Sequence, residues 1–132
     1  MKTPHGSGFS FVDRCDIVEP GRRAVGQMWL DPSSWFFEHH FPGKPMMPGV
    51  LLLECAAQVA GILWQAGGEM RPLFLAQIQQ FRWIKTVLPT QTVEVDVILE
   101  KDFGSLAQFE VTILVEKEIV AKGSITMGSS QI

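Results

Sequence analysis

His40 and Glu54 are two residues whose side chains suit a reaction that moves protons. The unperturbed pKa of histidine lies near neutrality, so an imidazole can accept a proton at an ordinary working pH. A glutamic acid in apolar surroundings keeps its proton, because burial raises the pKa of a carboxyl group. Such a pair can accept a proton at one atom and supply one at another. The alternative for each residue is structural: a histidine that satisfies loop backbone groups, or a buried and paired carboxylate.

Gln58 and Gly49 are the candidates for supporting this chemistry. Gln58 follows Glu54 by one helical turn and shares its face, where it can orient the carboxyl group or a water molecule. Gly49 stands where a helix is expected to begin, and the first N–H groups of a helix are unpaired and lie at the positive end of its dipole. One such donor to a carbonyl oxygen is typically worth about 3 kcal/mol. A role in a turn is the alternative for Gly49.

A rigid loop and a buried helix are expected to position these residues. Residues 42–49 include three prolines and two glycines, which forbid regular structure and fix the path of the chain. From residue 50 to residue 64 nearly every side chain is apolar, and a helix that is apolar all round lies inside a core. The pair Gly67 and Gly68 suits the C-terminal end of this helix.

Strands are expected on both sides of the helix along the chain. Before it, a first strand or short helix-strand segment over residues 9–18 and a strand over residues 22–30 are separated by the turn Glu19-Pro20-Gly21. After it, side chains alternate with a period of two over residues 73–83, 93–100, 109–115 and 119–127. A buried helix followed by an antiparallel meander predicts an α+β fold, one domain over residues 1–132 with the sheet wrapped round the helix. The tail from Gly128 looks loose.

Composition excludes several classes of protein. A net charge of −3 gives no electrostatic case for nucleic acid, and the longest apolar run is far too short to cross a membrane. The first residues show no signal-peptide pattern and there are only two cysteines, so we expect a cytoplasmic protein without disulfides. His39 and His40 are adjacent, but no cysteine or carboxylate cluster completes a metal site. We expect no metal and no organic cofactor, since no glycine-rich nucleotide loop follows a strand.

The loop and the helix together carry a recognisable motif. It is similar to the signature of FabZ-type 3-hydroxyacyl-acyl-carrier-protein dehydratases, in the FabA/FabZ-like family, at His40-Phe41-Pro42-Gly43, Pro45, Met47-Pro48-Gly49-Val50-Leu51, Glu54 and Gln58. The resemblance implies a hotdog fold in which His40 and Glu54 are the catalytic residues and come from different subunits of a homodimer. FabA-type relatives carry aspartate at the helix position, so Glu54 favours a simple dehydratase without isomerase activity.

The activity implied by this resemblance is conversion of a (3R)-3-hydroxyacyl-[acyl-carrier-protein] to the trans-2-enoyl form, in fatty-acid or related acyl-chain biosynthesis. The implied partners are the acyl carrier protein and a second copy of the chain, with a trimer of dimers as the larger assembly. Two alternatives are a hotdog acyl thioesterase and a non-catalytic hotdog subunit. A thioesterase does not need the pair of His40 and Glu54, and retention of both catalytic residue types speaks against a non-catalytic subunit.

The sequence also departs from the family pattern. His39 stands where a glycine is usual, and the absence of tyrosine means that a tyrosine gate is missing or replaced by Phe74. Several basic residues are candidates to meet an acidic carrier protein, although a solvated surface is the default role for each: Arg22, Arg23, Lys44, Arg71, Arg82 and Lys85. Other aromatic residues are expected in the core more than along an acyl tunnel: Trp35, Phe36, Phe37, Phe81 and Trp83.

Overall fold

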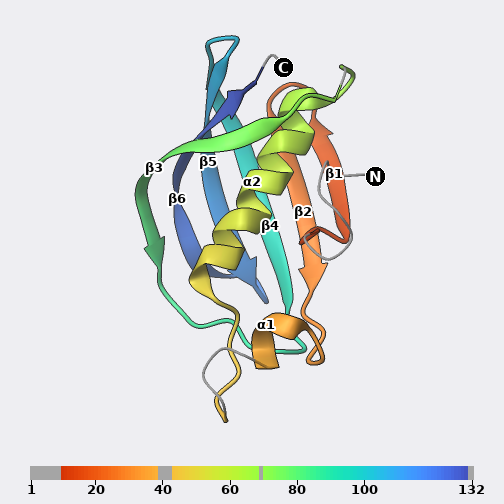
Figure 1. The fold of residues 1–132 in the computed structure, drawn as a ribbon, viewed down its shortest axis with the longest axis vertical. Coiled ribbons are helices and arrows are strands. Elements are labelled where there is room, and N and C mark those ends of the chain that lie inside the picture. Colours follow the sequence, from red (N-terminus) through yellow and green to blue (C-terminus); the bar gives the residue numbers. More distant parts are fainter. Residues whose placement is uncertain (1–9, 39–42, 69, 131–132) are drawn as a thin grey trace.

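One long helix lies against a curved antiparallel sheet (Figure 1). The computed structural model describes residues 10–38, 43–68 and 70–130. In chain order the elements are β1 (Arg14–Glu19), β2 (Arg23–Trp29), α1 (Trp35–Glu38), α2 (Gly49–Gln65), β3 (Leu73–Trp83), β4 (Thr92–Asp102), β5 (Leu106–Val115) and β6 (Glu118–Ser129). The six strands form one sheet in the order β1-β2-β4-β5-β6-β3.

The core forms between the concave face of the sheet and α2. In β4, Val93, Val95 and Val97 are at most 2% exposed, while Glu94 and Asp96 between them are only partly buried. The same alternation along β5 buries every second side chain. Hydrophobic burial on one face of each strand therefore holds the sheet against the helix, and the predicted α+β class is confirmed.

The position of β3 departs from a simple meander. Strands β4, β5 and β6 follow one another as antiparallel neighbours, but β3 pairs with β6 at the far edge of the sheet. Residues 84–91 carry the chain across one end of the molecule from β3 to β4 (Figure 1). β3 is also irregular, with register shifts between Leu75 and Gln77 and between Gln79 and Arg82. Its other edge has no strand partner within the described residues.

Two predicted boundaries were wrong. The first strand begins only at Arg14, because the preceding segment turns inward and the Phe11 N–H donates to a side chain of α2. The end of the chain is not loose at Gly128, which pairs with β3 and β5 at once. Ser129 extends the pairing, and its N–H donates to the Ser105 carbonyl over 2.9 Å. Among the described residues, no helix combines the length and the apolar character that crossing a membrane requires.

Candidate active site

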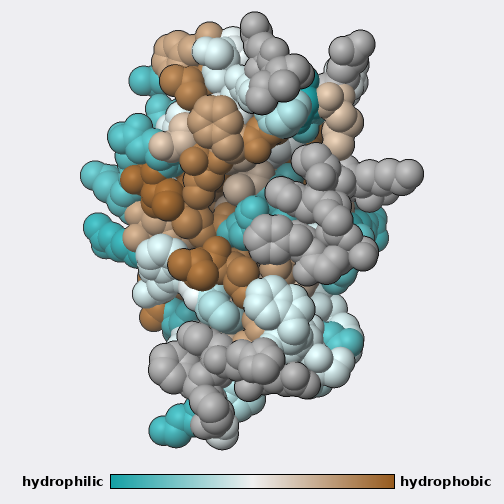
Figure 2. Space-filling view, in the orientation of Figure 1, coloured by the Kyte–Doolittle hydropathy of each residue, from teal (hydrophilic) through white to brown (hydrophobic). Residues whose placement is uncertain are grey.

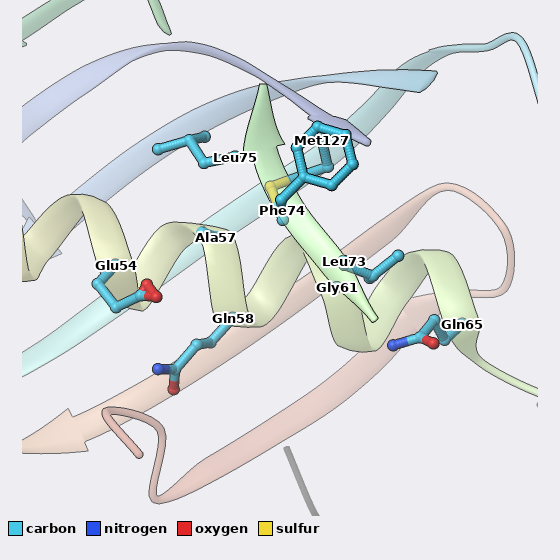
Figure 3. A pocket seen from close by; sticks show the side chains of 9 residues that line it. All are labelled: Glu54, Ala57, Gln58, Gly61, Gln65, Leu73, Phe74, Leu75 and Met127. Carbon is cyan, nitrogen blue, oxygen red and sulfur yellow. The ribbon is translucent and has the colours of Figure 1, made fainter. Parts of the chain in front are cut away.

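A pocket of about 120 Å³ lies between α2 and the first part of β3 (Figure 3). Its helix side is one stripe of α2, with Glu54 at one end, Gln65 at the other and the small residues Ala57 and Gly61 between them. A β-carbon on Gly61 would lie 3.2 Å from Cδ1 of Leu73, so a larger residue there would narrow the pocket. The remaining walls are apolar: Leu73, Phe74, Leu75 and Met127. The arrangement suits a hydrocarbon chain beside a single carboxyl group.

Phe74 lines this pocket, at the position proposed to replace a tyrosine gate. Its ring covers Gly128 on the neighbouring strand, where a β-carbon would overlap the ring. Phe74 is nonetheless 51% exposed, so part of the ring remains at the open side of the pocket.

Glu54 is half-buried and its carboxyl group belongs to the pocket (Figure 3). Its neighbours along the helix, Leu53 and Cys55, are 6% and 0% exposed and face the core. The helix therefore presents the carboxyl group on a surface that is otherwise largely apolar, as the sequence predicts.

Gln58 lines the same pocket, and its side chain is engaged by the N-terminal segment. Its Oε1 accepts a hydrogen bond from the Phe11 N–H over 2.8 Å, and the residue is only 3% exposed. Phe11 in turn contacts Phe36 of α1, with ring centroids 6.0 Å apart. Gln58 thus connects α2 to the segment that packs on α1. An orienting effect of Gln58 on Glu54 stays a prediction.

Gly49 is the first residue of α2, where the sequence places it. The N–H groups of Leu51 and Leu52 both donate to the Pro48 carbonyl, over 3.0 and 3.4 Å. Within the described residues, the N–H groups of Gly49 and Val50 have no backbone acceptor. The first turn also contains no acidic residue, so its partial positive charge is not offset there. These two donors can serve a carbonyl oxygen, and the role of Gly49 as such a donor stays a prediction.

His39 and His40 lie outside the described residues, so the structure does not place either imidazole relative to Glu54. No group of three histidine, cysteine, aspartate or glutamate side chains that could hold a metal ion occurs in the described part of the chain. Burial raises the pKa of the Cys15 thiol to about 11 and raises that of the Cys55 thiol further. Neither thiol is therefore suited to act as a nucleophile.

Trp83 is a residue of this region whose environment the sequence did not predict. Phe36 and Phe37 are buried as expected, whereas Trp35 and Trp83 are 52% and 46% exposed. The Trp83 indole Nε1–H donates to the Gly49 carbonyl over 2.9 Å. A tryptophan in an alternating strand is normally predicted to be a core residue. No local feature of the sequence identifies one whose indole bonds the start of a helix.

An antiparallel sheet wrapped around one long helix defines the hotdog class, and solved structures agree with this fold. The dehydratase heterocomplex ApeI:P from Xenorhabdus doucetiae matches with a TM-score of 0.84 at 14% identity, over 98% of this chain and 88% of that chain. The protein PH1136 from Pyrococcus horikoshii matches with a TM-score of 0.69 at 18% identity, over 92% of this chain and 85% of that chain. At these identities the likeness concerns the fold alone.

The family follows from the sequence comparisons. The FabA-like domain model matches residues 3–124, and the chain belongs to the FabA-like family. It is 36% identical over 134 residues to the 3-hydroxyacyl-[acyl-carrier-protein] dehydratase FabZ of Escherichia coli, covering 97% of this chain and 87% of the relative. It is 35% identical over 124 residues to the FabZ dehydratase of Herpetosiphon aurantiacus, covering 92% of this chain and 88% of the relative. The family that the sequence motif predicts, that of the FabZ-type dehydratases, is confirmed.

Proposed function

We propose that this chain is a hydro-lyase that converts (3R)-3-hydroxyacyl-[acyl-carrier-protein] to trans-2-enoyl-[acyl-carrier-protein]. The observation that carries the proposal is the pocket in which Glu54 borders an apolar groove along α2, in a chain about a third identical to FabZ dehydratases. The groove accommodates the acyl chain and the carboxyl group meets its reactive end.

The reaction needs a base at C2 and an acid at C3. His40 takes the C2 proton, the C–H electron pair forms the C2–C3 double bond, and the C3–O bond breaks. Glu54 gives its proton to the departing hydroxyl, which leaves as water. Negative charge that develops on the thioester oxygen is stabilised by the Gly49 N–H at the start of α2. A second donor is available from Val50, whose N–H has no backbone acceptor in the described residues.

The proposed active unit is a homodimer in which His40 of one subunit faces Glu54 of the other. The free edge of β3 supports this, because within the described residues the strand exposes large apolar side chains that a second copy would cover: Phe74, Leu75 and Ile78. Figure 2 shows an apolar area on the face where β3 crosses α2. An exposed apolar edge strand invites pairing with another chain. A trimer of such dimers remains the proposed larger assembly.

The proposed substrate carrier is acidic, and the exposed side chains of Lys44 and Arg82 are candidates to meet it. Lys44 lies on the loop before α2 and Arg82 lies on β3. Lys85 is also exposed but forms an ion pair with Glu118. A cytoplasmic location is consistent with two buried cysteines that form no disulfide.

Two measurements test the proposal. Enoyl absorbance should rise when the protein is incubated with 3-hydroxyacyl-[acyl-carrier-protein], whereas release of free thiol from acyl thioesters would indicate a thioesterase. No turnover of either substrate would favour a non-catalytic subunit. His40→Ala and Glu54→Ala should each be inactive, and mixing them under conditions of subunit exchange should restore part of the activity. Failure to recover activity despite demonstrated exchange would contradict a shared site.

A further inference from the structure

We propose that Trp83 is a positioning residue for the reaction: its indole fixes the first turn of α2, and Gly49 must be glycine because that indole approaches it. This inference rests on the proposed function, since it concerns the two backbone donors at the start of the helix.

The Trp83 indole lies against the backbone of Gly49 and leaves no room for a side chain there. The indole Nε1–H donates to the Gly49 carbonyl over 2.9 Å. A β-carbon on Gly49 would lie 2.8 Å from the Trp83 Nε1 and 3.0 Å from its Cδ1, which is too close for real atoms. Gly49 is not among the described glycines with positive φ, so backbone conformation does not explain it. The ring of Trp83 occupies the space that a side chain would need.

The hydrogen bond acts on the peptide that the chemistry needs. The Gly49 carbonyl and the Val50 N–H belong to one peptide group, which is planar. A donor on the carbonyl holds the plane of that peptide and polarises its N–H, since linked hydrogen bonds strengthen one another. Pro48 precedes the helix and makes no side-chain hydrogen bond to it. The indole, which belongs to β3, therefore provides part of the restraint that a capping side chain usually gives to the first turn of a helix.

The surroundings of Trp83 suit a positioning role more than a core role. The side chain is 46% exposed and borders a second, open pocket of about 220 Å³. That pocket is formed by the loop before α2, the start of α2 and the segment after β3: Met46, Met47, Gly49, Leu52, Trp83, Ile84, Lys85, Thr86 and Val87. Phe81 supports the indole from the same strand, with ring centroids 5.0 Å apart. An indole in this place contributes its hydrogen bond without filling the core.

Trp83→Phe tests the hydrogen bond, because it keeps an aromatic ring and removes the N–H. Loss of one neutral hydrogen bond corresponds to about a three- to tenfold effect, and we expect kcat to fall by that factor while KM changes less than twofold. The pH profile should keep its shape, because neither proton-transfer group is altered. Trp64→Phe is the matched control: its indole donates to Asp102 Oδ2 over 3.1 Å at the other end of α2, so kcat should not change. Equal kcat in wild type and Trp83→Phe would overturn the proposal, as would an equal loss in Trp64→Phe.

Gly49→Ala provides a second test. The added methyl group should displace the indole and shift the Nε1–H signal of Trp83 in an NMR spectrum, identified by its loss in Trp83→Phe. In a Trp83→Ala background the same change at Gly49 should have little further effect on kcat. An unmoved indole signal, or effects that simply multiply, would refute the coupling. The NMR measurement needs no turnover, so it tests the contact even if the proposed dehydratase activity proves wrong.

Discussion

Replacing Gln58 by leucine should loosen the N-terminal segment from α2. The Phe11 N–H would lose its acceptor, and water cannot readily replace it because Phe11 is 2% exposed and Gln58 3% exposed. An unsatisfied buried donor costs about 1–3 kcal/mol. For a domain of this size 1 kcal/mol corresponds to roughly 3–5 °C in Tm, so Tm should fall by about 3–15 °C.

The assay combines thermal unfolding, limited proteolysis and kinetics. In Gln58→Leu, the segment before β1 should be cleaved faster, and dehydration should slow because Gln58 also lines the pocket. Gln65→Leu is the matched control, since Gln65 is 7% exposed, lies on the same helix and accepts the Arg71 N–H through its Oε1. We expect it to lower Tm comparably without faster cleavage of the N-terminal segment. An unchanged Tm and an unchanged cleavage rate in Gln58→Leu would contradict the prediction, because they would show that the hydrogen bond from Phe11 stabilises neither the fold nor the N-terminal segment.

Three further predictions concern the proposed acid Glu54, the buried thiol of Cys15 and the packing of α2 against β2. Glu54→Gln should still bind the substrate but lower kcat by about 10²–10⁴-fold, measured by enoyl absorbance. Burial raises the pKa of the Cys15 thiol from 9.0 to about 11 in the folded protein. Between pH 9 and 11 the unfolded chain therefore binds fewer protons than the folded protein, so the free energy of unfolding should fall as the pH rises. Urea titrations should show a less steep fall in Cys15→Ala. Gly26→Ala would overlap Cγ2 of Val59 and should lower stability by about 1–3 kcal/mol in the same titration, whereas Gly68→Ala, with its nearest contact at 3.6 Å, should not.

The elements were predictable where their signals are local. Alternation in β4 and the apolar run of α2 identify both correctly, because burial of one face leaves a periodic pattern in the sequence. The place of β3 in the sheet was not predictable in this way. Its partner β6 begins at Glu118, well after β3 ends at Trp83, and the choice of partner depends on how the whole sheet closes round the helix.

Part of the candidate site was likewise predictable from local sequence, and part was not. The places of Glu54 on the helix and of Gly49 at its start were predictable, because a buried helix with one carboxylate and a glycine at its start is a local pattern. The catalytic roles of both residues stay predictions. The bond from Phe11 to Gln58 and the bond from Trp83 to Gly49 were not, since each joins residues more than thirty positions apart. Nothing in the local sequence marks these side chains, and they come into contact only because of how the whole chain folds.

These long-range bonds share one effect, which is to restrain α2 at several points along its length. The Trp83 indole holds the start of the helix, and Gln58 ties its middle to the N-terminal segment. Along the side of the helix that faces the sheet, Gly26 leaves room for Val59 to approach β2 closely. A helix restrained in this way cannot readily shift or rotate, so Glu54 and the donors at the helix start keep a fixed spacing. Catalysis by positioned proton donors depends on such rigidity, because small displacements cost large factors in rate.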